Sequence, residues 1–173
     1  HQAAPDEFPP NPTRLGPPGT AQGKAREGHF DPLDHGYDLN ERDVERAARF
    51  IAELKRFETE GEMPRLQIVR LPNDHTQGTA VGKPTPTAMV ADNDLALGQL
   101  VDLISHSAIW KESAIFVLED DAQNGPDHVD AHRSILLAIS HFSHRGVFDC
   151  PLYTTSSVLR TMARILGLPP LIR

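Results

Sequence analysis

The chain has 173 residues and a formal net charge of −7 at pH 7, with 17 Lys and Arg against 24 Asp and Glu. This acidic balance argues against a nucleic acid as a fixed partner and against an anionic membrane surface, because both repel negative charge. No apolar run in the sequence approaches the length of a membrane span. The single cysteine, Cys150, excludes an intrachain disulfide and leaves the compartment open.

Residues 1–28 are predicted to form a Pro/Gly-rich arm or linker, and residues 29–173 a single domain. Prolines and glycines recur through the first segment without helical or strand periodicity. The second segment has an ordinary globular composition and is long enough to bury a core. Because the chain begins at His1 without a charged and then apolar leader, we expect a processed product or a piece of a longer protein.

The first predicted helix covers residues 41–60, where apolar side chains recur at helical spacing. Gly61 is expected to end this helix, since glycine adopts the left-handed conformation that closes many helices. A strand is predicted over residues 65–71, which are rich in Leu, Ile and Val. Pro72 ends that strand, so residues 73–76 are expected to lie in a loop.

A loop rich in Gly, Pro and Thr is predicted over residues 78–86, followed by a second helix over residues 87–106. Two short apolar runs, residues 114–118 and 135–139, are predicted as strands that are covered on both faces. A last helix is predicted over residues 156–166.

Strands that alternate with helices predict an α/β layered fold with a largely parallel sheet. In such folds, ligands bind outside the carboxyl ends of the strands. Both acidic, histidine-containing segments of the chain come directly after a predicted strand, so we expect them at one edge of the sheet.

The stronger of these segments is residues 119–132, which hold four Asp, one Glu and two His in fourteen positions. Asp120 and Asp121 are adjacent carboxylates that repel one another, and a bound cation would offset this repulsion. His128 and His132 are four residues apart, a spacing that brings side chains together on a helix. Carboxylate oxygen with neutral imidazole nitrogen suits zinc, manganese or iron better than calcium alone. A solvated acidic turn is the alternative interpretation.

The weaker segment contains Asp74 and His75. An Asp–His pair after a strand is also typical of a turn with a surface histidine, so its weight comes from pairing with residues 119–132. A cation site at this edge would leave room for a phosphate oxygen. Arg133 is the stronger candidate for that contact and Lys83 the weaker, because Arg133 neighbours His132.

Four motifs, in order and with close spacing, resemble those of the bacterial phosphoesterase family. This family is related to phosphatidylcholine-type phospholipases C and acid phosphatases, belongs to the alkaline-phosphatase superfamily, and is often joined to β-propeller repeats. The resemblance covers roughly residues 28–171. The motifs are Leu71-Pro72-Asn73-Asp74-His75-Thr76, Met89-Val90-Ala91-Asp92-Asn93-Asp94, Glu119-Asp120-Asp121 through Asp127-His128-Val129-Asp130-Ala131-His132-Arg133-Ser134, and Leu159-Arg160-Thr161 with Gly167-Leu168-Pro169-Pro170.

The resemblance implies an α/β fold with a three-layer, alkaline-phosphatase-like sheet that has helices on both faces and is incomplete in this chain. Residues 29–173 would then be the C-terminal part of a phosphoesterase domain. It also implies divalent metal ions as cofactors, with zinc, manganese and calcium as candidates. The implied metal ligands are Asp74, His75 and His132 in one group, Asp120 and Asp121 in a second group, and His128 close by.

Two departures from the family pattern bear on this ligand set. In the wider superfamily a His follows the first Asp by four residues, whereas this chain has Gly78 there and His75 beside Asp74. The phospholipase C branch has an Asp–His pair before its final helix, whereas this chain has Tyr153-Thr154-Thr155. Either His132 is more important here, or water fills one coordination position.

The implied function is metal-dependent phosphoester hydrolysis, with a phosphoester as substrate. Neither the family's Glu-Asn-Arg metal-binding strand nor its Ser or Thr nucleophile is matched here, so no catalytic nucleophile is assigned. We therefore expect an N-terminal half of the same protein, or another subunit, to complete the sheet and the site. The family is exported, which implies a periplasmic or secreted location. The alternatives are a non-catalytic metal-binding or assembly subunit and a structural protein with solvated acidic loops.

Overall fold

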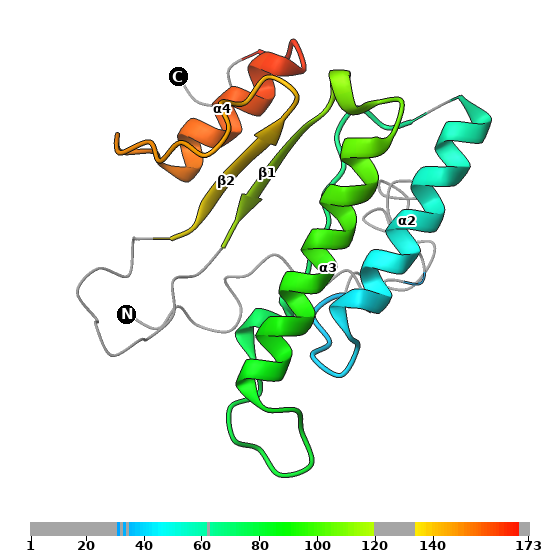
Figure 1. Cartoon of the computed structure of the whole chain (residues 1–173), viewed down its shortest axis with the longest axis vertical. Helices are drawn as coiled ribbons and strands as arrows, with labels where there is room; N and C mark the ends of the chain where they lie inside the picture. The colour runs from blue at the N-terminus through cyan, green and yellow to red at the C-terminus, as the bar shows by residue number, and fades with distance from the viewer. Residues whose placement is uncertain (1–30, 32, 34, 62, 120–133, 170–173) are drawn as a thin grey trace, which may run out of the picture. The chain divides into compact units, whose positions relative to one another are not determined.

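The computed structural model describes residues 31, 33, 35–61, 63–119 and 134–169. These residues divide into two compact units. The first contains the residues up to Met63 together with Gln67–Leu100, and the second contains Pro64–Leu66 and the residues from Val101 onward. In chain order the elements are α2 (Asp43–Glu60), the 3-10 helix η2 (Pro72–His75), α3 (Pro86–His106), the 3-10 helix η3 (Trp110–Glu112), β1 (Ala114–Leu118), β2 (Leu136–Ser140) and α4 (Thr155–Ile165). Figure 1 labels the three α-helices and the two strands.

Most of the predicted elements are confirmed to within two residues. The helix predicted over residues 41–60 is α2, and the one over 87–106 is α3. β1 matches its predicted run, and β2 lies one residue beyond the prediction. The helix predicted over 156–166 is α4, displaced by one residue. The predicted arm over 1–28 lies outside the described residues.

The strand predictions need two corrections. Residues 65–71, all of which are described, form no strand. β1 and β2 pair antiparallel, with Ala114 opposite Ser140 and Leu118 opposite Leu136, whereas largely parallel strands were predicted. The physical reason is the same for both errors: an apolar run indicates burial, and strand pairing and direction depend on distant segments.

The two strands are also less buried than predicted. Leu118 is 41% exposed and Leu137 is 42% exposed, so the β1–β2 ribbon is not covered on both faces within the described residues. The described part of the sheet has two strands. A three-layer sheet with helices on both faces therefore stays a prediction for this chain.

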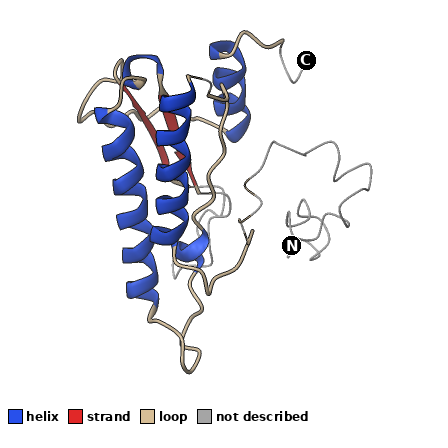
Figure 2. Ribbon diagram, turned by 90° about the vertical axis from the view of Figure 1, so that its right-hand side faces the viewer, coloured by secondary structure: helices blue, strands red, loops and turns tan. Residues whose placement is uncertain are grey.

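In the first unit, α2 and the first part of α3 run side by side, as Figures 1 and 2 both show. Ala47 and Ala96 are both fully buried and belong to one core cluster with Leu100. Two alanines at a helix contact allow the backbones to approach closely, and larger apolar side chains then fill the flanks. Those flanking side chains are Val44, Phe50, Ile51 and Leu71.

The helix ends follow the signals in the sequence. Gly61 closes α2 with a φ of +75°, and its N–H donates to the Phe57 carbonyl at 2.8 Å. Glycine pays no steric penalty in this left-handed conformation. At the start of α4, the Thr154 hydroxyl and the Ser157 backbone and side chain form a capping box.

The second unit contains the β1–β2 ribbon and α4, which lies along the ribbon in Figure 1. Val158 and Ala163 are buried on α4. The Arg65 guanidinium donates to the Leu166 carbonyl at 3.2 Å, which ties the short segment Pro64–Leu66 to the end of α4. Among the described helices, none is both long and apolar enough to cross a membrane.

Candidate functional site

The short 3-10 helix η2 turns its consecutive side chains to different environments. Asn73 is only 3% exposed, whereas Asp74 and His75, the next two residues, are both exposed. The turn therefore has a buried polar anchor and carries a carboxylate and an imidazole at the surface. These are the two residues of η2 that were predicted as metal ligands.

Two carboxylates hold the buried anchor. The backbone N–H of Asn73 donates to Asp43 Oδ2 at 2.9 Å, and its side-chain amide donates to Asp92 Oδ2 at 3.2 Å. Asp43 is fully buried at the start of α2, and Asp92 lies in the first half of α3. Both helices of the first unit thus contribute to holding η2.

His75 is oriented by two contacts. Its Nδ1 lies 3.0 Å from the carbonyl oxygen of Thr76, and its ring meets the ring of Tyr37 edge-on at a centroid distance of 5.6 Å. A neutral imidazole with its proton on Nδ1 donates this bond and keeps the Nε2 lone pair for another partner. Metal-binding histidines characteristically use such a backbone carbonyl to fix the tautomer.

The residue after His75 has a strained backbone. Thr76 has a φ of +62° and a ψ of 174°, a region that is essentially restricted to glycine. Its N–H donates to the Asn73 carbonyl at 3.0 Å, and its hydroxyl accepts from the Gly78 N–H at 3.2 Å. Beyond it, the Gln77 side chain donates to the Leu39 carbonyl at 2.9 Å. Strain of this kind persists only where the surroundings over-determine the conformation, and it concentrates at functional sites.

The two anchoring carboxylates experience opposite electrostatic environments. Burial raises the pKa of Asp43, and the nearby charge of Asp92 adds to the rise, while hydrogen bonds from Asn93 and Asn73 and the charge of Arg46 partly offset it. Burial also acts to raise the pKa of Asp92. There, however, hydrogen bonds from Arg42, Asn73 and the Asp43 amide outweigh it and leave the pKa below its ordinary value. Asp92 is therefore held firmly as an anion.

The other predicted ligands fall outside the described residues. Asp120, Asp121, His128 and His132 are among them, as is the predicted phosphate contact Arg133. No group of three His, Cys, Asp or Glu that could hold a metal ion occurs among the residues that the structure does describe. The predicted meeting of Asp74 and His75 with residues 119–132 is therefore untested.

The residues that flank this segment are described and are joined to one another. The N–H of Glu119 donates to the Ile135 carbonyl at 3.4 Å, and the Ser134 hydroxyl donates to the Glu119 carbonyl at 2.9 Å. Glu119 directly follows β1, so the acidic segment starts and ends at the same end of the β1–β2 ribbon. The segment therefore begins directly after a strand, as predicted, while residues 120–133 themselves lie outside the described residues.

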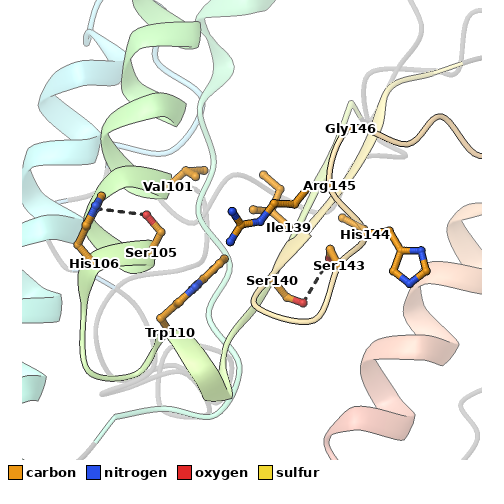
Figure 3. A pocket seen from close by; sticks show the side chains of 11 residues that line it. Val101, Ser105, His106, Trp110, Ile139, Ser140, Ser143, His144, Arg145 and Gly146 are labelled. Atoms are coloured by element: carbon orange, nitrogen blue, oxygen red, sulfur yellow. Dashed lines mark hydrogen bonds between the residues drawn. The ribbon is translucent and has the colours of Figure 1, made fainter.

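A concave region of about 530 Å³ lies in the second unit, between the end of α3, η3 and the turn after β2 (Figure 3). Arg145 points into it toward Trp110, whereas His144 points away. Ser140 and Ser143 already pair with each other at 3.3 Å. Its described lining contains no Asp or Glu, so this region does not resemble a cation site.

Sequence reasoning missed Asp43 and Asn93 and gave Asp92 no role of its own. One signal was present in the sequence. Asp43 stands one turn ahead of Ala47 and three turns ahead of Leu54 on the apolar face of α2, and both of those residues are buried. A carboxylate at the start of a buried apolar face is expected to be hydrogen-bonded, because an unpaired buried charge is costly.

Comparison of the chain with protein-family models, with curated proteins and with solved structures found no match in any of the three. The resemblance to the bacterial phosphoesterases therefore stands on the motifs in the sequence alone.

Proposed function

We propose that the chain is the metal-binding, C-terminal part of a metal-dependent phosphoester hydrolase. The observation that carries the proposal is the exposed Asp74–His75 pair on a strained turn that buried carboxylates anchor. Such a turn presents one oxygen and one nitrogen ligand on consecutive exposed residues, and borderline metals such as zinc favour this combination.

The remaining ligands would come from the acidic segment after β1. Asp120, Asp121 and His132 would complete the coordination, with His128 close by. A divalent cation held by these residues would supply Lewis-acid polarisation of a phosphoryl oxygen. Arg133 would hold a second phosphate oxygen through its guanidinium. The attacking Ser or Thr hydroxyl would come from outside this chain.

A completing partner is part of the proposal. It would be an N-terminal half of the same protein or another subunit, and it would extend the sheet toward the three-layer arrangement. Two paired strands are marginally stable by themselves, and their open edges offer unpaired backbone groups to a further strand. The half-exposed Leu118 and Leu137 lie on opposite faces of the ribbon, so both faces have apolar surface that a partner would cover. A periplasmic or secreted location is proposed from the family resemblance.

The second candidate is a non-catalytic metal-binding or assembly subunit that retains the phosphoesterase fold. It is favoured by the absence from this sequence of a matched nucleophile motif. Metal binding is common to both candidates, and hydrolysis in the completed assembly separates them.

The first test is metal binding by the chain itself. Zinc and manganese affinities are measured at neutral pH by competition with a chromophoric chelator, for the wild type and for Asp74→Asn, His75→Ala and Asp120→Asn. Each substitution is expected to lower affinity at least about tenfold, because each removes a direct ligand. Asp94→Asn is the matched control, since Asp94 is an exposed carboxylate on α3.

The second test is turnover of an aryl phosphate monoester and a diester by the native assembly. Asp120→Asn is expected to abolish turnover, and Asp94→Asn to leave it unchanged. A wild-type chain that binds neither metal would overturn the proposal. Binding without any hydrolysis would instead identify a non-catalytic metal-binding subunit.

A further inference from the structure

We infer that Asp92 is a positioning residue for the Asp74–His75 pair, acting through Asn73, with Asp43 as its partner in this role. The role depends on the proposed metal-binding function of Asp74 and His75. It assigns a task to two buried carboxylates that the ligand set itself does not use.

Asp92 collects hydrogen bonds from three different residues. Its Oδ1 accepts from Arg42 Nε at 3.0 Å and from Arg42 Nη2 at 2.8 Å. Its Oδ2 accepts from the Asp43 backbone N–H at 2.7 Å and from the Asn73 side chain at 3.2 Å. The Asp92 side chain is only 9% exposed, whereas the Arg42 side chain is 63% exposed. The bonds to Asp43 and Asn73 are therefore part-buried, and those to Arg42 lie at the surface. One carboxylate therefore joins the start of α2 to η2.

The bond to the Asp43 N–H makes Asp92 a helix cap supplied from another helix. The first N–H groups of a helix lack intrahelical partners, and a nearby carboxylate satisfies them and favours the positive end of the helix dipole. A cap alone needs one local side chain such as Ser or Asp. Here the capping oxygen also accepts from Asn73, so the position of η2 depends on the start of α2.

Asp43 and Asn93 hold the turn from its other side. Asp43 Oδ2 accepts from the Asn73 backbone at 2.9 Å and from the Asn93 side chain at 2.9 Å. The same Asn93 amide nitrogen donates to the Leu71 carbonyl at 2.8 Å. Leu71, just before η2, and Asn73, within it, are thus both held by side chains of α2 and α3.

The network ends where the exposed ligands begin. Asn73 is buried and bound at its backbone and its side chain, and Asp74 and His75 follow it directly in the same 3-10 turn. Burying carboxylates is costly, and well-packed apolar side chains often stabilise a fold as well or better. A buried network that is coupled to a strained, ligand-bearing turn is therefore better explained by positioning than by stability alone. Groups that orient metal ligands typically change affinity by 10–100-fold when they are removed.

Asn73→Ala is the decisive variant. It removes the side-chain amide through which Asn73 binds Asp92. Two other bonds stay in place: the Asp43 N–H still donates to Asp92 and caps α2, and the backbone N–H of residue 73 still donates to the Asp43 carboxylate. We expect zinc affinity to fall about tenfold with little change in the melting temperature. Asp92→Asn also weakens the cap of α2, so it is expected to lower both the zinc affinity and the melting temperature. Asp94→Asn, two residues further along α3, is the matched control and is expected to change neither.

The full chain is used, with Zn²⁺ alone as the probe and with circular dichroism and the melting temperature as checks of folding. The ring ¹⁵N signals of His75 provide a readout that a purely structural role would not move. They are expected to report the Nδ1–H tautomer in the wild type and a mixture of tautomers in Asn73→Ala. Wild-type affinity and an unchanged His75 tautomer in a folded Asn73→Ala variant would overturn the positioning role. Failure of the wild type to bind Zn²⁺ through His75 would instead overturn the proposed function.

Discussion

Thr76 shows most directly that the turn is held against local preference. A β-branched residue at a φ of +62° and a ψ of 174° carries strain of about 1–3 kcal/mol, which neighbouring contacts must offset. The Asn73 carbonyl, the Gly78 N–H and the His75 ring all bond to Thr76. The strain is therefore concentrated in the one residue that follows the exposed Asp74–His75 pair.

Substitutions at Thr76 test this strain. Thr76→Gly and Thr76→Ala both remove the hydroxyl that accepts from Gly78, so they differ mainly in backbone freedom. We expect the glycine variant to be more stable than the alanine variant by about 1 kcal/mol, because glycine adopts this conformation without strain. Urea denaturation of both variants measures the difference. The usual order, with alanine more stable than glycine, would show that residue 76 is not strained in solution.

The charge of Asp92 gives a second residue-scale prediction, for the pH dependence of stability. Because the pKa of Asp92 is lowered in the folded state, its contribution is fully present above the unfolded value of about 3.9 and is lost as the pH falls through the folded pKa. Asp92→Asn is expected to destabilise the wild type by about 1–2 kcal/mol at neutral pH, through the weakened cap and the bonds to Arg42. The penalty should shrink in acid.

The measurement is the free energy of unfolding from neutral pH down to about pH 3 for the wild type and for Asp92→Asn. Asp94→Asn serves as the control, since Asp94 is exposed on the same helix. A penalty for Asp92→Asn that stays constant in acid would show that Asp92 is not held as an anion in the fold. Asp43 has the opposite effect on the pH dependence of stability, because burial raises its pKa. Its ionisation lowers the free energy of unfolding as the pH rises above the ordinary aspartate range.

At the residue scale, the sequence could indicate the exposed part of the site but not its support. Asp74 and His75 were predicted as metal ligands because they follow an apolar run that Pro72 ends. Asp43 and Asp92 are 49 positions apart and bond only through the contact between two helices. Hydrophobic periodicity predicts which residues of each helix are buried, and it does not predict which buried polar groups will meet.

At the scale of elements, the ends of the helices test how far local signals determine structure. Gly61 closes α2 with a φ of +75°, whereas Gly98 lies within α3 and has no positive φ. Within the described part of the chain, an added methyl group at either position would meet nothing within 4 Å. Backbone conformation is therefore the main difference between the two sites.

Gly61→Ala is expected to destabilise the protein by about 1 kcal/mol, because alanine is strained in the left-handed region. Gly98→Ala is expected to stabilise it by about 0.5–1 kcal/mol, because alanine favours a helix interior. Thermal melts of the two variants give the comparison. Equal effects of the two substitutions would contradict the assigned conformation of Gly61.

The elements whose signals are local were predicted well, and those that depend on distant partners were not. α2, α3 and α4 follow from periodicity, with glycine just after the ends of α2 and α4, and β1 follows from its apolar run. The antiparallel pairing of β1 with β2, and the absence of a strand over residues 65–71, depend on which backbone lies alongside. Such pairing is set by tertiary context, which composition does not encode.

At the scale of the whole molecule, the described residues bury few large side chains and expose many. Leu54 is the one large apolar side chain among them that is less than 2% exposed. Phe142, Phe148 and Leu152 are 76%, 98% and 90% exposed, and all three lie between β2 and α4. Clusters of exposed large apolar residues mark interaction surfaces in soluble proteins. This agrees with the proposed completing partner, which would cover apolar surface of the second unit.

We therefore expect the isolated chain to associate with itself at micromolar concentration when the partner is missing, and to bind a hydrophobic dye. The double variant Phe148→Ser/Leu152→Ser should weaken both effects, because it removes two large apolar side chains from the surface between β2 and α4. Val81→Ser is the matched control, since Val81 is also fully exposed but belongs to the first unit, in the glycine-containing turn before α3. Sedimentation velocity over a range of concentrations measures the association, and dye fluorescence measures the exposed apolar surface. A monomeric wild type with a cooperative melt and no dye binding would show that the chain is complete without a partner. An equal effect of Val81→Ser would show that the association is unspecific.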